Sequence, residues 1–418
     1  MKILVLGGGV IGITSAYHLA RDGHEVTVLD RQHLAASETS YANAGLVAPG
    51  HAYAWASPKA PKILVKSLFK PDQALRLKLS ADPRMWSWFW LFLMQCTAER
   101  ARVNTIRKLG LCLYSLQALD EVVRDTGVAY DGLRSGNLYL YRTEESFAAG
   151  VDHTGILREH GLDMQVVEGD ALTAIEPALE PVKDRIAGAV YSPTDQSGDA
   201  RMFTRALAAY CEKKLGVELD FDTSIRAIET ERDRVAGVLT DAGRRTADVY
   251  VMALGCDSAM MGRSIGLKLP IYPVKGYSVT VPLRKSNAVP RMGGVDEDNL
   301  VAYCPMGERL RLTSTAEFSG YDCSHRPEDF RAMLRSAREL FPSAGDYDRP
   351  DYWAGLRPMT PQGTPFLGKA RYENLFLNTG HGHIGWTMSC GSARVTADLV
   401  AGRKPDIDLT GMTYGGSA

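Results

Sequence analysis

The stretch that determines the fold is MKILVLGGGVIGITSAYHLARDGHEVTVLD, which occupies residues 1–30. It contains two short apolar runs, separated by a segment with apolar residues at helical spacing. The predicted strand, helix and strand are residues 2–6, 10–22 and 25–30. Two short apolar strands joined by a helix are typical of a buried parallel βαβ unit. The sequence therefore predicts an α/β fold built on this unit.

The turn between the first strand and the helix has the pattern GxGxxG, formed by Gly7, Gly9 and Gly12. In such a turn the first glycine permits the tight bend, the second lets the backbone approach a pyrophosphate, and the third lets helix and strand pack closely. The helix N-terminus offers free N–H groups and the positive end of its dipole to phosphates. Asp30 ends the second strand, where an acidic residue accepts hydrogen bonds from ribose hydroxyls. These residues predict a dinucleotide site.

Two further segments indicate FAD rather than NAD. The loop SETSYANAG at 37–45 follows the second strand directly and carries short polar side chains suited to phosphate and ribitol contacts. A second glycine-rich passage from strand to helix, NTGHGHIGW, lies far away at 378–386. A long cofactor contacted by distant parts of the chain accounts for both segments. We expect FAD to contact Gly7, Gly9, Val10, Ile11, Gly12, Asp30, Arg31, Thr39, Ser40, Asn43, Ala44, Gly45, Leu46, Gly255, Gly382, His383, Ile384, Gly385, Trp386 and Thr387.

Composition and charge narrow the class of protein. A chain of 418 residues exceeds one ordinary hydrophobic core, which predicts two domains. The 48 basic and 49 acidic side chains nearly balance, whereas a nucleic-acid-binding surface needs a basic excess. The seven cysteines form no CxxC pair, so neither a disulfide framework nor a zinc site is expected. Glycines interrupt the N-terminal apolar run, unlike in a secretory signal, and we expect a cytoplasmic protein.

An apolar stretch, MWSWFWLFLM at 85–94, has about half the length of the roughly 20 residues that span a bilayer. One interpretation is a buried helix. The other is a surface helix whose aromatic rings enter a membrane interface, where indole rings are favoured. The rings concerned are those of Trp86, Trp88, Trp90 and Phe92. The second interpretation implies peripheral contact with the cytoplasmic face of the inner membrane.

The rest of the chain alternates between predicted helices and strands. Helices are expected at 100–126, 201–216, 328–341 and 385–401, strands at 136–141, 217–221, 275–282, 299–316 and 375–379, and an antiparallel meander over 224–251. Dinucleotide-type segments therefore occur at both ends and in the middle, with antiparallel-rich segments between them. The expected domains are a discontinuous FAD-binding domain of residues 1–48, 150–265 and 345–418 and a substrate domain of residues 49–149 and 266–344.

Several motifs resemble the bacterial D-amino-acid dehydrogenase small-subunit family, which belongs with D-amino-acid oxidase, glycine oxidase and sarcosine oxidase. The likeness runs almost from end to end. The motifs are HEVTVLDR (24–31), ETSYANAGLVAPG (38–50), PVKGYSVTVP (273–282), WAGLRPMTPQGTPFLG (353–368) and LNTGHGHIGWTMSCGS (377–392). The resemblance implies non-covalent FAD and a glutathione-reductase-type FAD-binding domain. It also implies an α+β substrate domain with a mixed or antiparallel sheet over the isoalloxazine ring.

An amino-acid substrate brings a carboxylate into a dry pocket, where a paired Arg is its usual partner. Arg357 in the GLRP motif is the expected partner, and the resemblance to glycine oxidase implies the same role for it. Lys275 is expected near the flavin ring. The other candidates for the substrate pocket are Tyr277, Tyr303, His51 and Tyr53. The chemistry belongs to the cofactor, so the protein is expected to orient the substrate and exclude water, without an essential general base.

The resemblance implies oxidative deamination of a D-amino acid to a 2-oxo acid and ammonia, with hydride transfer to flavin N5 and electrons passed to a quinone-type acceptor. An oxidase that reduces oxygen and a non-catalytic or macromolecule-modifying flavin module are alternatives. Two departures from the family concern the substrate. Gln362 replaces a common Asp, and Thr313 and Ser314 stand where relatives tend to have glycines. A narrower or more polar pocket is expected, so a cyclic substrate such as a hydroxy-D-proline is an alternative to D-alanine.

Overall fold

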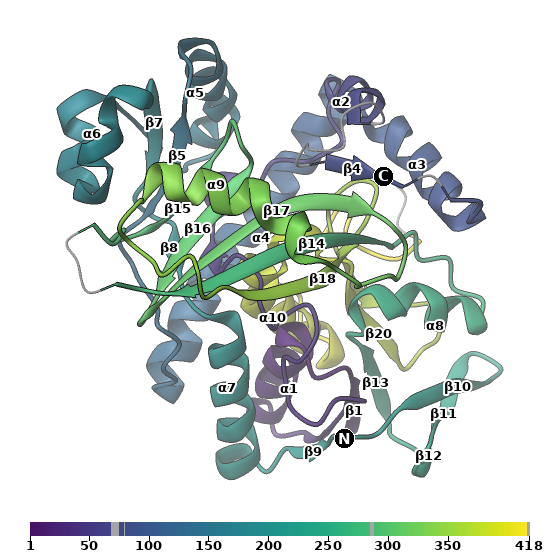
Figure 1. Cartoon of the computed structure of the whole chain (residues 1–418). Coiled ribbons are helices and arrows are strands. Elements are labelled where there is room, and N and C mark those ends of the chain that lie inside the picture. Colours follow the sequence, from purple (N-terminus) through teal and green to yellow (C-terminus); the bar gives the residue numbers. More distant parts are fainter. Residues whose placement is uncertain (68–74, 79, 285–287, 416–418) are drawn as a thin grey trace.

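The computed structural model describes residues 1–67, 75–78, 80–284 and 288–415, whose arrangement Figure 1 shows. The α-helices are α1 (Val10–Arg21), α2 (Ala60–Ser67), α3 (Pro83–Gln95), α4 (Ala98–Thr126), α5 (Glu144–Glu159), α6 (Gly169–Ile175), α7 (Ala200–Leu215), α8 (Ser258–Ser264), α9 (Arg331–Leu340) and α10 (Gly385–Val400). The short 3₁₀ helices are η1 (Pro49–His51), η2 (Pro177–Arg185), η3 (Gly255–Asp257), η4 (Pro327–Phe330) and η5 (Gly382–Ile384). The strands are β1 (Lys2–Leu6), β2 (Glu25–Leu29), β3 (Leu46–Val47), β4 (Leu75–Leu77), β5 (Asn137–Tyr141), β6 (Gln165–Val167), β7 (Gly188–Ser192), β8 (Gln196–Ser197), β9 (Glu218–Asp220), β10 (Ile225–Glu231), β11 (Arg234–Thr240), β12 (Gly243–Arg245), β13 (Val249–Met252), β14 (Tyr272–Pro282), β15 (Gly293–Asp296), β16 (Val301–Met306), β17 (Arg309–Phe318), β18 (Asp351–Met359), β19 (Phe366–Lys369) and β20 (Leu375–Thr379).

The N-terminal βαβ unit lies at the centre of a mainly parallel sheet. Within the described residues this sheet has six strands in the order β19-β20-β13-β1-β2-β9. β1 pairs in parallel with both β2 and β13, and α1 connects β1 to β2. The strand at the far edge, β19, pairs antiparallel with β20. The predicted βαβ unit and the α/β fold class are confirmed.

Both faces of this sheet are covered, which explains why its strands are apolar on both sides. On one face α1, α7, α10 and the C-terminal half of α4 share an apolar core that includes Ile3 of β1. On the other face the antiparallel meander β10-β11-β12, together with α8, covers a second core that includes Leu4 of β1. The predicted meander and the helices predicted at 100–126, 201–216 and 385–401 are confirmed.

A larger mixed sheet lies across the molecule above the first one (Figure 1). Within the described residues it has nine strands in the order β18-β14-β17-β16-β15-β5-β7-β6, with β4 paired to β17 off this path. On one face of the sheet, α9 packs with η4 and α6 over a core of side chains from β14, β16 and β17. The mixed sheet predicted for the substrate domain is therefore present.

Three strands of the large sheet come from segments that we expected in the FAD-binding domain. β6 and β7 fall within 150–265, and β18 falls within 345–418. β18 is an edge strand, and an edge tolerates Pro358, which has no N–H to donate to a neighbouring strand. Pro358 and Gly355 interrupt the alternation of side chains by which a strand is recognised in a sequence. The border between the two sheets therefore differs from the expected domain boundaries.

The apolar stretch 85–94 forms most of α3, which lies with α2 and β4 at one corner of the molecule (Figure 1). Trp88 and Phe92 are buried against β14 and β17, as the first interpretation requires. Trp86 and Trp90 point outward and are 51% and 65% exposed. α3 is therefore a surface helix with one buried aromatic face and one exposed aromatic face. In the described part of the chain, no helix is long and apolar enough to cross a membrane.

Candidate active site

The glycine-rich turn between β1 and α1 leaves no room for side chains. Gly7 has a φ of +112°, and a Cβ there would lie 2.6 Å from the carbonyl oxygen of Ala253. A Cβ on Gly12 would lie 1.8 Å from the carbonyl oxygen of Gly7, so α1 approaches β1 this closely because residue 12 is glycine. The N–H of Val10 donates to Ser40 Oγ at 3.1 Å, which draws the loop after β2 to the helix N-terminus. The turn has the geometry of a phosphate site.

Asp30 lies at the end of β2, beside this turn. Its carboxylate accepts hydrogen bonds from the N–H groups of Gly8 at 2.6 Å and Gln32 at 2.8 Å. Burial raises the pKa of the Asp30 carboxyl, although the two hydrogen bonds oppose the change. The next residue, Arg31, forms an ion pair with Asp257 at 2.9 Å. The acidic side chain is therefore fixed next to the glycine turn, as expected for a ribose ligand.

The second glycine-rich passage, between β20 and α10, forms another part of the same wall. Gly380 and Gly382 have φ values of +81° and +62°, which favour glycine, and α10 begins at Gly385 after the short helix η5. Trp386 Nε1 and His383 Nε2 are shielded from solvent and have no hydrogen-bond partner among the described residues. A buried polar nitrogen without a partner is costly unless a ligand satisfies it. These two rings therefore lie where a polar ligand would complete the structure.

A cavity of about 1480 Å³ connects the two glycine-rich passages. Apart from Gly12 and Thr387, all residues expected to contact FAD line it. Gly12 is covered by the turn, and Thr387 Oγ1 accepts a hydrogen bond from the N–H of Ala48 at 3.0 Å instead. The Thr39 hydroxyl also has a protein partner, because it donates to the carbonyl oxygen of Leu356 at 2.7 Å. The volume exceeds the roughly 300–1,000 Å³ of pockets for drug-sized ligands, so a long cofactor and a small substrate fit together.

Arg357 extends from β18 into this cavity. Its Nη1 donates to the carbonyl oxygens of Thr315 at 2.8 Å and Lys275 at 3.4 Å. Nε and Nη2 have no hydrogen-bond partner, and no carboxylate forms an ion pair with the guanidinium, within the described ranges. Burial lowers the pKa of Arg357 to about 10, which still leaves it cationic at neutral pH. On β14, a Cβ at Gly276 would lie 2.5 Å from Arg357 Cζ, so glycine there makes space for the guanidinium.

The carbonyl oxygen that holds Arg357 belongs to a strained residue. Thr315 has a φ of +64°, a left-handed conformation that is rare for β-branched side chains. β17 has one extra residue at this point relative to β14, which is a β-bulge. Thr313 and Ser314, just before the bulge, both line the cavity. The departure at Thr313 and Ser314 thus lies beside the space where a substrate would bind, whereas Gln362 does not line the cavity. Ser314 Oγ also donates to the carbonyl oxygen of Leu300 at 2.9 Å.

Two other predicted residues, His51 and Tyr53, also line the cavity. The His51 ring lies 6.3 Å from that of His383, edge to face, and its Nε2 lies 3.2 Å from Glu297 Oε1. Tyr53 packs against His153 with ring centroids 4.0 Å apart, and burial raises the pKa of its phenol. The structure thus brings His51 and Tyr53 to the cofactor turn, together with Glu297, which the sequence analysis did not single out.

The remaining two tyrosines do not present a hydroxyl beside Arg357. Tyr303 is 1% exposed, lies in the core between β16 and α9, and does not line the cavity. Tyr277 contributes to the cavity wall, but its hydroxyl donates to Glu317 at 2.8 Å. Successive residues of a strand point to opposite faces, so Gly276 faces the guanidinium and Tyr277 faces away. Tyr303 therefore lies outside the cavity, contrary to the expectation, whereas Tyr277 lines the cavity with its hydroxyl bound to Glu317.

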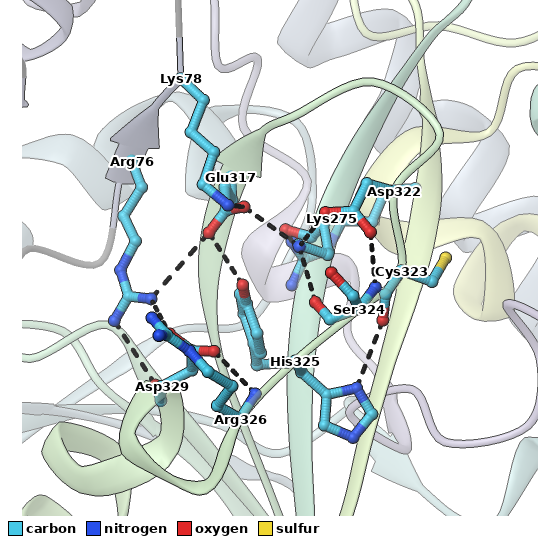
Figure 2. Close-up of polar contacts among 12 residues, drawn as sticks. Arg76, Lys78, Lys275, Glu317, Asp322, Cys323, Ser324, His325, Arg326 and Asp329 are labelled. Atoms are coloured by element: carbon cyan, nitrogen blue, oxygen red, sulfur yellow. Dashed lines mark hydrogen bonds and ion pairs between the residues drawn. The ribbon is translucent and has the colours of Figure 1, made fainter.

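Figure 2 shows a charge cluster around Glu317, which the sequence analysis did not reveal. Glu317 is 1% exposed and forms ion pairs with Lys78 at 2.8 Å, Lys275 at 3.1 Å and Arg76 at 3.9 Å. Burial would raise the pKa of Glu317, but the hydrogen bonds from its neighbours prevail and lower it to about 2. Lys275 therefore points away from the cavity, contrary to the expectation that it lies near the flavin ring.

The same lysine fastens the loop that follows β17. Lys275 Nζ donates to the carbonyl oxygen of Ser324 at 3.0 Å (Figure 2). In this loop, Tyr321 and Cys323 line the cavity, and the Tyr321 hydroxyl donates to the carbonyl oxygen of Cys256 at 3.0 Å. The charge cluster around Glu317 thus fixes the loop that forms this part of the cavity wall.

Comparison with known proteins agrees with this geometry. The family model described as FAD dependent oxidoreductase matches residues 2–399. A protein of Mesorhizobium japonicum named D-amino acid dehydrogenase 2 is 50% identical over 416 residues, which cover 100% of both chains. A D-amino acid dehydrogenase of Paramagnetospirillum magneticum is 46% identical over 99% of this chain and 98% of its own.

Solved structures share the fold. Glycine oxidase from Geobacillus kaustophilus matches with a TM-score of 0.76 at 24% identity, over 100% of this chain and 99% of its own. L-proline dehydrogenase from P. horikoshii matches with a TM-score of 0.74 at 18% identity, over 99% of this chain and 96% of its own. The two-sheet architecture around the cavity is therefore that of known oxidoreductases.

Proposed function

The chain belongs to the FAD dependent oxidoreductase family, and from this premise we propose that it is a D-amino acid dehydrogenase. The reaction is the oxidative deamination of a free D-amino acid to a 2-oxo acid and ammonia. FAD is the cofactor of the family, and the glycine-rich turns, the unpartnered Trp386 Nε1 and the large cavity fit it. The relatives that align over the full length are named D-amino acid dehydrogenases, and these names support the substrate class.

Arg357 is the observation that carries this proposal. It is a cation in the cavity wall, and its Nε and Nη2 have no hydrogen-bond partner among the described residues. A substrate carboxylate fits it because the planar guanidinium can bind both carboxylate oxygens. The carbonyl oxygen of Thr315 fixes the direction in which the guanidinium points. The site thus holds an amino acid by its carboxylate and determines where its α-carbon lies.

The other residues of the site orient the substrate and exclude water. When bound, FAD supplies the hydride acceptor, its N5 atom. Burial lowers the pKa of His381 to about 3 and that of His383 well below its ordinary value, so both rings stay neutral and do not compete with Arg357 for the carboxylate. Tyr321 and Cys323 close part of the wall. The imino acid released from the site reacts with water to give the 2-oxo acid and ammonia.

The test is reduction of the bound flavin without oxygen. The purified flavoprotein is mixed anaerobically with a panel of D- and L-amino acids that includes glycine and proline, and loss of the flavin absorbance is recorded. Rapid bleaching by D- but not L-enantiomers supports the proposal. A flavin that no free amino acid bleaches refutes it, and favours a non-catalytic or macromolecule-modifying flavin protein.

We further propose that a quinone-type acceptor takes the electrons at a membrane surface. The cavity is lined on one side by apolar residues of α2, β4 and α3, namely Ala60, Ile63, Leu64, Leu75 and Phe92. Next to it, α2 and α3 expose the apolar side chains Ile63, Val65, Trp86, Trp90, Leu91, Leu93 and Met94. An exposed apolar surface of this kind suits an interface with lipid, from which an apolar acceptor can enter.

Peroxide production separates this proposal from an oxidase. The enzyme is supplied with substrate in air, with and without a soluble quinone, and peroxide and reduced quinone are measured. A dehydrogenase reduces the quinone and makes little peroxide. Abundant peroxide without the quinone, unchanged when the quinone is added, identifies an oxidase.

A further inference from the structure

An ion pair that the proposed reaction does not use lies beside His383 in the same cavity. His51 Nε2 lies 3.2 Å from Glu297 Oε1, and both side chains line the cavity. The His383 ring lies 6.3 Å from the His51 ring, and Arg357 lines the same cavity as His383. The ion pair and Arg357 therefore line one cavity, and the ion pair lies next to the cofactor turn that carries His383.

Glu297 has hydrogen-bonding capacity to spare. A carboxylate accepts hydrogen bonds at both of its oxygens. In the described part of the chain, His51 is the polar group that contacts the Glu297 side chain, and it does so at Oε1. Burial would lower the pKa of His51, but the ion pair with Glu297 prevails and raises it, so His51 is the proton donor of the pair. Oε2 therefore remains as an acceptor in a cavity that binds a small molecule.

The pair is held rigidly from both sides. The His51 ring stacks on Tyr139, with centroids 5.7 Å apart and planes at 18°. Asp195 accepts hydrogen bonds from the Tyr139 hydroxyl at 2.5 Å and from the N–H of Gly50 at 3.0 Å, and so fixes the backbone next to His51. The backbone N–H of Glu297 donates to the carbonyl oxygen of Leu140 at 2.9 Å. Both partners thus have fixed positions, which a site for discriminating hydrogen bonds requires.

One family departure identified in the sequence strengthens the turn that carries Glu297. Ser314 Oγ donates to the carbonyl oxygen of Leu300, in the turn between β15 and β16. A glycine at residue 314 could not make this hydrogen bond. The residue that differs from the family pattern is therefore connected through the backbone to the acceptor at Glu297.

Charges around the pair favour a neutral hydroxyl over a cationic side chain. Lys108 is fully buried, its Nζ donates to the carbonyl oxygen of Tyr53 at 2.6 Å, and its charge acts on His51. Burial lowers the pKa of Lys108 to about 8, so it is still mainly protonated at neutral pH. An ammonium or guanidinium on a substrate would enter a cavity lined by His51 and Arg357, with the charge of Lys108 buried behind His51. A hydroxyl group meets no such repulsion and can donate to Oε2.

We infer that Glu297, oriented by His51, binds a hydroxyl group on the substrate side chain while Arg357 binds the substrate carboxylate. The preferred substrates are then D-amino acids with a neutral hydroxyl group on the side chain. This inference rests on the proposed function, because it takes the ligand of Arg357 to be an amino-acid carboxylate. It assigns Glu297 and His51 to substrate selection.

Two matched pairs of substrates test the inference on the flavin-containing enzyme: cis-4-hydroxy-D-proline against D-proline, and D-threonine against D-valine. In the first pair the hydroxyl group takes the place of a hydrogen atom, and in the second it takes the place of a methyl group. The quantity measured is the ratio of the second-order rate constants for anaerobic flavin reduction. We expect the wild-type enzyme to favour the hydroxylated member of at least one pair by about 30-fold, since a buried polar group left unpaired is costly. In Glu297→Gln that ratio falls about tenfold, because a neutral acceptor binds the hydroxyl less strongly.

Asp298→Asn is the matched control. Asp298 lies in the same turn, but it accepts hydrogen bonds from the N–H of Arg142 at 2.6 Å and from Ser146 Oγ at 2.8 Å, at the start of α5. This variant is expected to keep the wild-type ratio. If Glu297→Gln does not retain FAD, Glu297→Asp replaces it, since the shorter side chain withdraws the acceptor and also lowers the ratio.

The outcomes are distinct. Wild-type ratios near one in both pairs overturn the inference, and so does a Glu297 variant that keeps the wild-type ratio. If D-proline and D-valine bleach the flavin as fast as their hydroxylated partners, the role of Glu297 is refuted and the proposed function still stands. A flavin that none of the four compounds bleaches refutes the role of Glu297, and it refutes the proposed function as well when the wider panel of amino acids also fails to bleach it.

Discussion

Replacing Arg357 with lysine removes the planar fork but keeps the positive charge. In the structure, Nη1 is committed to the carbonyl oxygen of Thr315 at 2.8 Å, which leaves Nε and Nη2 to bind a carboxylate side by side. A lysine at this position carries its charge on one ammonium group at the end of a shorter side chain. It cannot both hold Thr315 and offer two parallel donors.

Loss of one partner of a desolvated, charge-assisted contact costs about 2–4 kcal/mol. That range corresponds to a fall of roughly 30-fold to 1,000-fold in kcat/KM for a D-amino acid, because 1.4 kcal/mol is a factor of ten. The assay is steady-state reduction of an artificial dye, with FAD content measured by absorbance. Since Arg357 belongs to β18 and not to the glycine turn, the variant should retain its FAD. Unchanged kcat/KM, or loss of FAD without a change in substrate affinity, would refute the assignment of the carboxylate to this residue.

Three other changes test separate parts of the structure. Gly276→Ala should fold and keep FAD but lower kcat/KM about tenfold in the dye assay, because its Cβ would lie 2.5 Å from the guanidinium carbon and displace a flexible side chain. Burial lowers the pKa of His381 to about 3. Its contribution to the free energy of unfolding is therefore complete above pH 6.5 and decreases as pH falls. Between pH 7 and pH 5 the free energy of unfolding loses about 2 kcal/mol of this contribution. Urea unfolding of His381→Gln at both pH values should show a pH effect smaller by that amount, and an equal effect would contradict a neutral buried ring. Trp86→Ser with Trp90→Ser should weaken co-sedimentation with anionic lipid vesicles by at least about tenfold, given about 25 cal/mol per Å² of ring area, whereas the exposed control Leu239→Ser should not.

The parts of the fold that sequence predicts well are those in which neighbours along the chain interact. The glycine turn, α1 and the strands on either side form a local unit whose apolar spacing and glycine positions are all visible over 1–30. The cofactor wall was predictable for the same reason, since each of its two passages has a local signature. By contrast, β18 joins a sheet through pairing with β14, and its edge position allows Gly355 and Pro358 to interrupt the pattern.

The candidate substrate site was predictable only in part, because it depends on which face of a strand a side chain occupies. Nothing local indicates that Tyr303 points into the core below α9, or that a bulge at Thr315 changes the alternation of β17. Glu297 was not predicted as a site residue because its partner, His51, lies far away in the sequence. Arg357 was predicted from its motif, but its support by Gly276 becomes visible only when two strands are paired.

The hydrogen bond from Thr39 to the carbonyl oxygen of Leu356 connects the loop after β2 with the strand that carries Arg357. Thr39 belongs to the loop that follows β2 and lines the cofactor cavity, whereas Leu356 is adjacent to Arg357 on a strand of the other sheet. Any ordering of this loop by FAD therefore also restricts the backbone from which the guanidinium extends. Thermodynamic linkage makes such an effect reciprocal. A substrate analogue should bind more tightly to the flavin-containing protein than to the apoprotein, and by the same factor it should raise the equilibrium affinity of the protein for FAD.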